Sequence, residues 1–240
     1  VGYTGEDGIL ITDKDSYDRL NLSTFMGVDV NSWLTTQLDL KYANSKQNKV
    51  EAGGRNTVWV AAMNLPSYQN NEEYEENGIV YAPESPATYI RYGDPRKIKR
   101  NDLRALGRII LSPLKGLKIT GEYTYNRTTE QNKFYKNKYQ YIGMNFTGIL
   151  NSTENSSYAV TSKYTDYNAV NLFANYDMTF GKHDISVMGG YNQESSHTES
   201  QYSYRTDVVV GSLPSLSLST GTPITNDAFE EFAIRGLFYR

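Results

Sequence analysis

The sequence contains no cysteine, and this absence excludes a disulfide framework and any metal site built on thiolates. Extracellular eukaryotic β proteins of this size more often carry disulfides, so the absence fits a cytosolic protein or a bacterial envelope protein equally well. No apolar run approaches the roughly 18 residues that a transmembrane helix needs. The net charge of −3 gives no basic excess of the kind that a general nucleic-acid-binding protein carries. No glycine-rich phosphate loop of the Walker type is present.

The chain also lacks an initiator methionine and a recognisable signal peptide. It opens on Val1-Gly2-Tyr3 and closes on FAIRGLFYR, and both stretches read as strands. A natural domain rarely starts and stops inside strands, so we expect a fragment of a longer polypeptide.

Tyrosine is the residue that stands out, with 21 Tyr against 8 Phe and 2 Trp. Tyrosine suits a boundary where one end of the ring is dry and the other end is wet. A tyrosine-rich soluble β domain would have the same composition, so the spacing of the residues has to decide.

Apolar and polar residues alternate with period two over most regular stretches, which predicts strands. The alternating segments are 21–31, 34–42, 103–111, 117–126, 168–180, 185–191 and 232–238. Phe25 and Phe173 interrupt the alternation by lying among the polar positions. We expect a final strand near Phe232, Ile234, Gly236 and Phe238 that runs to the end of the sequence.

The connections between these segments are of two alternating kinds. Asn31-Ser32-Trp33, Pro113 to Gly116 and Gly181 to His183 are tight, whereas about 45–100, 129–167 and 206–227 are long and polar. Compact soluble domains seldom carry loops longer than about 12–15 residues. Tight turns at one end and long loops at the other are typical of outer-membrane β-barrels. An eleven-residue strand tilted near 40° spans roughly 28 Å, close to the apolar band of an outer membrane.

A β-sandwich would show the same alternation, because its strands also have one apolar and one polar face. In a sandwich the apolar face packs inward, whereas in a large barrel it faces lipid and the polar face lines the lumen. Aromatic residues near the strand ends, Trp33 and Phe180 beside tight turns and Tyr42, Tyr125 and Tyr191 towards the long loops, fit two membrane-interface belts. Cross-strand aromatic pairing is the alternative explanation.

The polar strand positions and the loop aromatics are the candidate binding residues. The candidates for the lumen are Arg104, Arg108, Asn171, Asn175 and Asp177. The candidates for contact with a substrate or partner are Tyr68, Tyr74, Tyr89, Tyr92, Tyr135, Tyr139 and Tyr141, whose rings can stack on sugars or anchor proteins. Packing within the loops would account for each of these tyrosines equally well.

Three groups of charged residues could have a catalytic or binding role, or could be ordinary turn, loop and surface residues. His197 lies near Glu194 and Glu199, but no positioned nucleophile accompanies the pair, and His183 is expected to be a turn residue. Glu72, Glu73, Glu75 and Glu76 offer oxygen ligands for Ca²⁺ without the spacing of a calcium loop, which favours a solvated loop. The basic run Arg96, Lys97, Lys99 and Arg100 could contact lipopolysaccharide phosphates or could simply keep a strand entry soluble.

Several short motifs, taken in order, resemble the barrel of SusC-type (SusC/RagA-type) TonB-dependent transporters of Bacteroidetes. They are VGYTGEDGIL, YDRLNL, VDVNSWLTTQLDLKYA, PSYQNNEEYEENGIVY, ILSPLKGLKITGEYTYN and FGKHDISVMGGYNQESS. The resemblance implies an all-β chain, residues 1–240, that forms an antiparallel segment of a plugged transmembrane barrel of about 22 strands. The plug domain and the remaining strands of the family are absent from it.

The same resemblance implies a function in the bacterial outer membrane. The expected function is TonB-dependent import of a glycan, oligosaccharide or peptide, with a SusD-like surface lipoprotein as partner and with TonB acting through the absent plug. Outer-membrane lipid and lipopolysaccharide would surround the barrel, and no enzymatic activity or cofactor is implied. The alternatives are a secreted or surface-exposed β-sandwich binding module or adhesin, and a barrel enzyme that uses His197.

Overall fold

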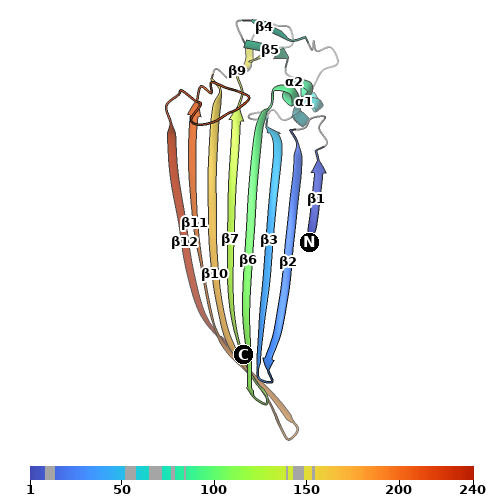
Figure 1. The fold of residues 1–240 in the computed structure, drawn as a ribbon, viewed down its shortest axis with the longest axis vertical. Helices are drawn as coiled ribbons and strands as arrows, with labels where there is room; N and C mark the ends of the chain where they lie inside the picture. Colours follow the sequence, from blue (N-terminus) through green and yellow to red (C-terminus); the bar gives the residue numbers. More distant parts are fainter. Residues whose placement is uncertain are drawn as a thin grey trace.

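One long antiparallel sheet makes up most of the chain, with a small group of short elements at one end (Figure 1). The structure is a computed structural model and describes residues 1–8, 14–51, 58–64, 72–76, 79–83, 85–138, 140–142, 149–152 and 155–240. The strands of the long sheet, in spatial order, are β1 (Gly2–Asp7), β2 (Ser16–Asn31), β3 (Leu34–Glu51), β6 (Asp94–Leu114), β7 (Leu117–Lys136), β10 (Ser157–Phe180), β11 (His183–Thr206) and β12 (Ile224–Tyr239). Each strand therefore pairs with the next long strand along the chain.

The tight turns lie together at one end of the sheet, as the sequence predicts (Figure 1). They join β2 to β3, β6 to β7 and β10 to β11. Gly116 has φ +86° and Gly181 has φ +65°, a left-handed conformation that a side chain disfavours and that glycine adopts without strain. The long connections lie at the opposite end, so the predicted asymmetry of the loops is confirmed.

The strands are longer than the hydrophobic alternation predicts. β10 and β11 each contain 24 residues, and β6 continues to Asp94 through what the sequence assigns to a loop. Beyond the apolar segment both faces of these strands carry polar residues, so hydropathy no longer alternates although the backbone ladder continues. A pattern of hydropathy can locate only the part of a strand whose two faces meet different surroundings.

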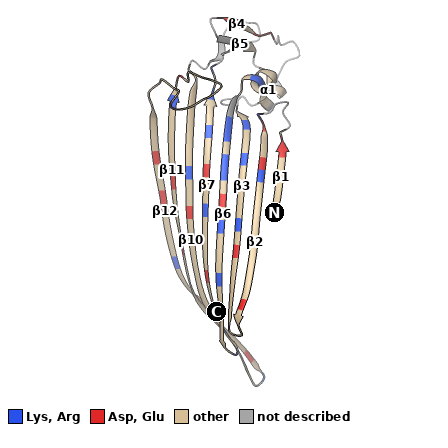
Figure 2. Cartoon of the chain, in the orientation of Figure 1, with Lys and Arg blue, Asp and Glu red and all other residues tan. Residues whose placement is uncertain are grey.

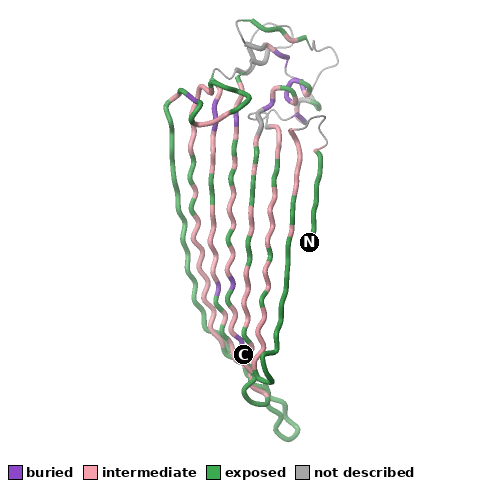
Figure 3. The backbone as a smooth tube through the Cα atoms, viewed as in Figure 1, coloured by how far each residue is buried: buried purple, intermediate pink, exposed green. Residues whose placement is uncertain are grey.

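The apolar face of the sheet is exposed, which distinguishes the fold from a β-sandwich. Ile109, Leu172 and Val187 are 52%, 51% and 54% exposed, and most strand residues are exposed or half-buried (Figure 3). Among the described residues, the buried hydrophobic ones are Val58, Ala82, Tyr89, Tyr135, Tyr158 and Ala169, and most of them lie near the loop end. The fold is therefore all-β, an open antiparallel sheet of the kind that forms a segment of a β-barrel, and the predicted fold class is confirmed.

The register places the two faces. Residues that pair across antiparallel strands lie on the same face, so Gly107 opposite Tyr123 and Val170 belong to the apolar face. We call the other one the polar face; it holds Arg108, Glu122 and Asn171 in one row.

Phenylalanines also lie on the polar face. Phe173 pairs with Gly190, which in turn pairs with Phe238 of β12, so both rings lie on the polar face. The ring of Phe238 lies against Gly190, where a Cβ would be 2.3 Å from it. The final strand that the sequence predicts is present as β12, and Phe232, Ile234 and Gly236 share the polar face with Phe238 because they pair with Ser196, Glu194 and Asn192.

The short elements form a cap at the loop end. They are α1 (Val58–Asn64), β4 (Tyr74–Glu76), β5 (Ile79–Pro83), α2 (Pro86–Tyr92), β8 (Gln140–Ile142) and β9 (Ile149–Ser152). β4, β5, β8 and β9 make a second sheet, in which β5 pairs in parallel with β8. This pairing joins the connection between β3 and β6 to the connection between β7 and β10. Neither helix in the described part of the chain is long and apolar enough to span a membrane.

Candidate functional site

A row of five polar side chains crosses the polar face on five neighbouring strands. The row, which we call the polar belt, consists of Gln37 on β3, Arg108 on β6, Glu122 on β7, Asn171 on β10 and Asn192 on β11. Arg108 donates from Nε to Glu122 Oε1 at 2.6 Å and from Nη1 to Gln37 Oε1 at 3.1 Å. Asn171 donates to Glu122 Oε2 at 3.4 Å, and Asn192 donates to Asn171 Oδ1 at 2.6 Å.

The polar belt is continuous because each member pairs by register with the next member and is hydrogen-bonded to it. Glu122 is the acceptor at its centre, and its side chain is 16% exposed. A carboxylate in this position holds the guanidinium of Arg108 and the amide of Asn171 in fixed orientations through charge-assisted bonds. The belt thus offers a fixed set of amide and guanidinium groups to whatever lies against the polar face.

Arginines recur along the polar face of β6 at every fourth residue. They are Arg96, Arg100, Arg104 and Arg108, and basic residues are spaced along β6 in Figure 2. Arg100 bonds Asp102 through both carboxylate oxygens, and Arg96 lies over the ring of Phe134 at 4.8 Å. Arg108 is held in the polar belt.

Arg104 differs from the other three arginines of β6. It is exposed, and it makes no hydrogen bond or ion pair with any residue that the structure describes. The residue directly opposite it on β3 is Lys41, which is paired with Asp39 at 3.3 Å. On its other side lies Asn126, whose buried Oδ1 has no hydrogen-bond partner among the described residues. Among the four arginines of β6, Arg104 is therefore the one whose charge is available to an anionic group from outside the sheet.

The other two predicted lumen residues lie closer to the tight turns. Asn175 is half-buried, and its Oδ1 has no hydrogen-bond partner in the described part of the chain. Asp177 is exposed and accepts from Ser186 Oγ at 2.5 Å, while its backbone N–H donates to Gly116 O. All five predicted residues share the polar face, but only Arg108 and Asn171 are joined in the polar belt.

Four tyrosines on the apolar face have a common orientation. Their hydroxyls donate towards the loop end of the sheet: Tyr42 to Asn101 at 3.1 Å, Tyr123 to Asn168 at 2.7 Å, Tyr125 to Asp166 at 2.8 Å and Tyr191 to Gln193 at 2.6 Å. Each ring thus has an apolar body beside the aliphatic residues of its face and a polar tip among amides and carboxylates. At the opposite end, Trp33 and Phe180 are 49% and 73% exposed beside the tight turns.

The tyrosines that the sequence assigns to loops separate into exposed and buried ones, and the structure places Tyr89 in α2 and Tyr135 in β7. Tyr74 is 44% exposed and stacks on Tyr81 with ring centroids 4.8 Å apart. Tyr89 and Tyr135 are 1% and 9% exposed, so their burial leaves no ring face for a ligand. Tyr141 lies in β8, and Tyr68 and Tyr139 lie outside the described residues.

Tyr92 is held in the cap by a charged partner. Its hydroxyl donates to Glu73 Oε2 at 2.7 Å, and Arg91 donates to the same oxygen at 2.8 Å. Burial raises the pKa of Tyr92 above its ordinary value, and the hydrogen bond to Glu73 raises it further. Glu73 thus accepts two bonds within the cap, and no group of three or more acidic or histidine residues in the described ranges could hold a metal ion.

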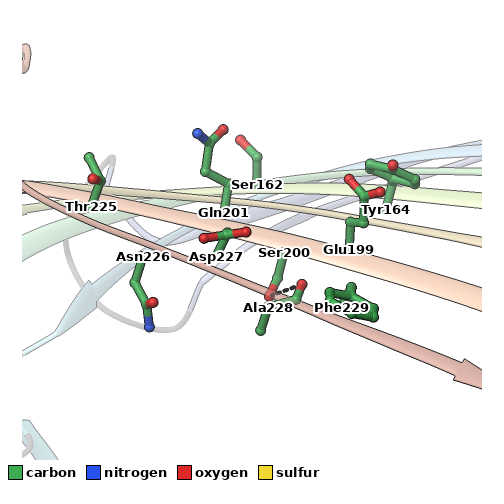
Figure 4. Close-up of a pocket in the computed structure, with 10 residues that line it drawn as sticks. All are labelled: Ser162, Tyr164, Glu199, Ser200, Gln201, Thr225, Asn226, Asp227, Ala228 and Phe229. Atoms are coloured by element: carbon green, nitrogen blue, oxygen red, sulfur yellow. Dashed lines mark hydrogen bonds between the residues drawn. The ribbon is translucent and has the colours of Figure 1, made fainter.

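His197 lies on the apolar face and not towards the polar belt. Its Nε2 is 2.9 Å from Glu199 and its Nδ1 is 2.5 Å from Glu231 of β12. Beside it, a hollow of about 480 Å³ opens between β10, β11 and β12, at the free edge of the sheet (Figure 4). Glu199, Gln201 and Asp227 line this hollow, and among the described residues the hydrogen-bond partners of His197 are carboxylates and not a nucleophile. Both nitrogens of the ring are occupied by carboxylates, which favours a structural role.

The sequence alone does not identify the belt partners Gln37, Glu122 and Asn192. Their polar positions follow from the alternation, but which positions meet across strands depends on the register. Register is set by turn geometry and by the packing of the whole sheet. The tight turns at Gly116 and Gly181 are the sequence signals from which the register of two hairpins could have been counted.

Comparison with known proteins finds a likeness of fold. No family model matches the sequence, and no curated protein matches it. A solved structure of the RagAB peptide transporter is similar with a TM-score of 0.75 at 13% identity, over 94% of this chain and 26% of that chain. Structures of the RagAB peptide importer in its open-open and closed-closed states give TM-scores of 0.76 and 0.74, both at 13% identity and over 94% of this chain. This chain therefore spans about a quarter of the length of the chains it matches.

Proposed function

We propose that this chain is a barrel segment of a SusC-like TonB-dependent transporter in the bacterial outer membrane, and that the transporter imports a nutrient. The observation that carries the proposal is the arrangement of the long sheet. It has an exposed apolar face, a hydrogen-bonded polar face, tight turns at one end and a folded cap at the other. A water-soluble domain has no use for an exposed apolar face of this size, whereas lipid requires one.

The tyrosines of the apolar face support the same location in the outer membrane. Tyr42, Tyr123 and Tyr125 share the apolar face with aliphatic neighbours and direct the hydroxyl towards the loop end. This is the arrangement expected of an aromatic girdle, where the ring lies at the boundary between acyl chains and water. The cap would then lie outside the cell and the tight turns in the periplasm.

The polar face would line the lumen and contact the plug, which together with the remaining strands lies outside this segment in our proposal. Amide, carboxylate and guanidinium groups of the polar belt can bond the hydroxyls of a glycan or the backbone of a peptide. The fold likeness to a peptide transporter favours a peptide between these two classes. TonB would supply energy through the plug.

The cap offers a surface for a SusD-like lipoprotein. Its second sheet joins two long connections, so a partner that binds there contacts both at once. Tyr74 presents an exposed ring on this sheet. We infer that the cap meets the lipoprotein and the arriving substrate.

Membrane fractionation and uptake of the full-length protein test the proposal. We expect the protein in the outer-membrane fraction, soluble only with detergent, and we expect deletion of its gene to abolish growth on a peptide or oligosaccharide that the intact gene restores. Recovery of the full-length protein as a soluble species without detergent would overturn the transporter assignment. Outer-membrane location with undiminished growth on every peptide and glycan supplied would overturn the import function alone.

A further inference from the structure

Four lysines gather on the apolar face of the sheet, beyond the tyrosines; in the proposed barrel this is the outward face. They are Lys46 on β3, Lys97 and Lys99 on β6, and Lys133 on β7. Lys46 pairs directly with Lys99, and Lys97 pairs directly with Lys133, so the four occupy two adjacent rows of the same face. All four are exposed. Strand alternation divides the basic run of the sequence, because Arg96 and Arg100 lie on the polar face.

The lysine cluster makes no ion pair in the described part of the chain. None of the four lysines makes a hydrogen bond or an ion pair with a described residue. The remaining outward positions of these rows on the three strands are Asn48 and Gln131, which are neutral. The nearest carboxylate of the face by register is Asp18, opposite Lys46, and it accepts from the Tyr3 hydroxyl at 2.7 Å. Like charges directly opposite each other destabilise a strand pair, so an anion from outside would relieve both pairs.

The height of the cluster fits the headgroup region of a membrane. Tyr42 and Leu103 form the last outward row with apolar bodies on β3 and β6 before the lysine cluster, and Lys46 and Lys99 follow four residues later. Four residues of a strand tilted near 40° rise roughly 10 Å. An extended lysine side chain covers most of this distance back towards the acyl boundary while its charged end stays in water.

We propose that Lys46, Lys97, Lys99 and Lys133 bind the phosphate groups of an anionic glycolipid headgroup in the outer leaflet. The site rests on the proposed membrane location of the barrel. Lysine contacts phosphate as a mobile point charge, which suits a headgroup whose phosphates have no fixed geometry relative to the protein. The tyrosines below would contact the boundary of the same lipid's acyl chains.

The test compares binding of one lipid with and without its phosphates. The full-length protein is inserted into phosphatidylcholine vesicles that contain bisphosphorylated lipid A or fully dephosphorylated lipid A, and the lipid retained per protein is measured by mass spectrometry across a concentration series. The variant is Lys46→Gln with Lys99→Gln. The matched control, Lys118→Gln with Lys163→Gln, removes the same charge from the polar face of β7 and β10.

The wild-type protein and the control should retain the phosphorylated lipid. The variant that lacks Lys46 and Lys99 should bind it about 30-fold more weakly at low salt, because each lysine near a charged surface strengthens binding about fivefold and the two factors multiply. Equal retention of the two lipids by the wild-type protein, or an equal loss in the control, would overturn the proposal. Competition by inorganic phosphate at the affinity of the lipid would also overturn it, in favour of a site for a free anion. If the protein inserts and imports its nutrient while phosphate makes no difference, only this inference fails.

Discussion

The ion pair between Arg108 and Glu122 is the strongest contact of the polar belt, and its energy is the sharpest test of the register. The atoms are 2.6 Å apart, and the side chains are 38% and 16% exposed. Exposed ion pairs contribute about 0.2–1 kcal/mol, whereas hydrogen bonds to charged groups contribute about 1.5–3 kcal/mol. Because Arg108 is partly in water, we expect a coupling energy of about 1–2 kcal/mol.

A double-mutant cycle measures this coupling. The variants are Arg108→Met, Glu122→Ala and their combination, and the quantity is the free energy of unfolding of the full-length protein by urea in phospholipid vesicles. Glu122→Ala should cost more than Arg108→Met, because it removes the acceptor of both Arg108 and Asn171. Arg104→Met is the control on the same face of the same strand; since Arg104 has no described partner, its loss should change stability by no more than about 0.5 kcal/mol.

Additivity would refute the reasoning. If the double variant loses the sum of the two single losses within about 0.5 kcal/mol, the two side chains do not interact and the row does not form a belt. A loss for Arg104→Met as large as that for Arg108→Met would show that any arginine of β6 stabilises the sheet by its charge alone.

Two further predictions concern the turns and the cap. Gly116→Ala should destabilise the protein more than Gly181→Ala. Both glycines have positive φ, so each substitution should cost about 1 kcal/mol of stability, but a Cβ at Gly116 would also lie 2.2 Å from Asp177 O, whereas a Cβ at Gly181 meets open space. Equal losses of stability in urea unfolding would contradict the turn geometry. Tyr92 should ionise above the ordinary tyrosine range, seen as the difference in tyrosinate absorbance between the wild-type protein and Tyr92→Phe. Because the pKa of Tyr92 is raised in the folded protein, its contribution to folding stability is complete below the ordinary tyrosine pKa of about 10 and is lost as the pH rises through the pKa of the folded protein. A difference spectrum that titrates at the ordinary pKa would contradict the burial of Tyr92 and its bond to Glu73.

The sequence predicts the parts of the fold that depend on neighbouring residues. Alternation from 168 to 191 with a glycine turn between is enough to give the β10–β11 hairpin, its apolar face and its polar face. The placement of Arg108 and Asn171 on one face follows from the same periodicity, because residues on a strand need only be counted to be assigned a side.

The remaining features depend on pairing between distant residues. The polar belt requires that Gln37 and Arg108, 71 residues apart, meet in one row, and nothing local in either segment encodes that meeting. The parallel pairing of β5 with β8 is likewise set by two connections folding together. The outer parts of β6 and β10 were missed for another reason: both faces there carry polar residues, which removes the difference in hydropathy on which the prediction depends.

The six cations between residues 96 and 108 of β6 divide by type as well as by face. Every one on the polar face is an arginine, at 96, 100, 104 and 108, and both on the outward face, Lys97 and Lys99, are lysines. The guanidinium group forms planar, directional bonds, and it does so here with Asp102 and Glu122, so it suits a wall that must keep its polar groups in place. The ammonium group stays hydrated and mobile, which suits contact with a fluid headgroup layer. In the proposed membrane location one strand would therefore meet two different surroundings, and on β6 the choice between arginine and lysine follows the side on which each residue lies.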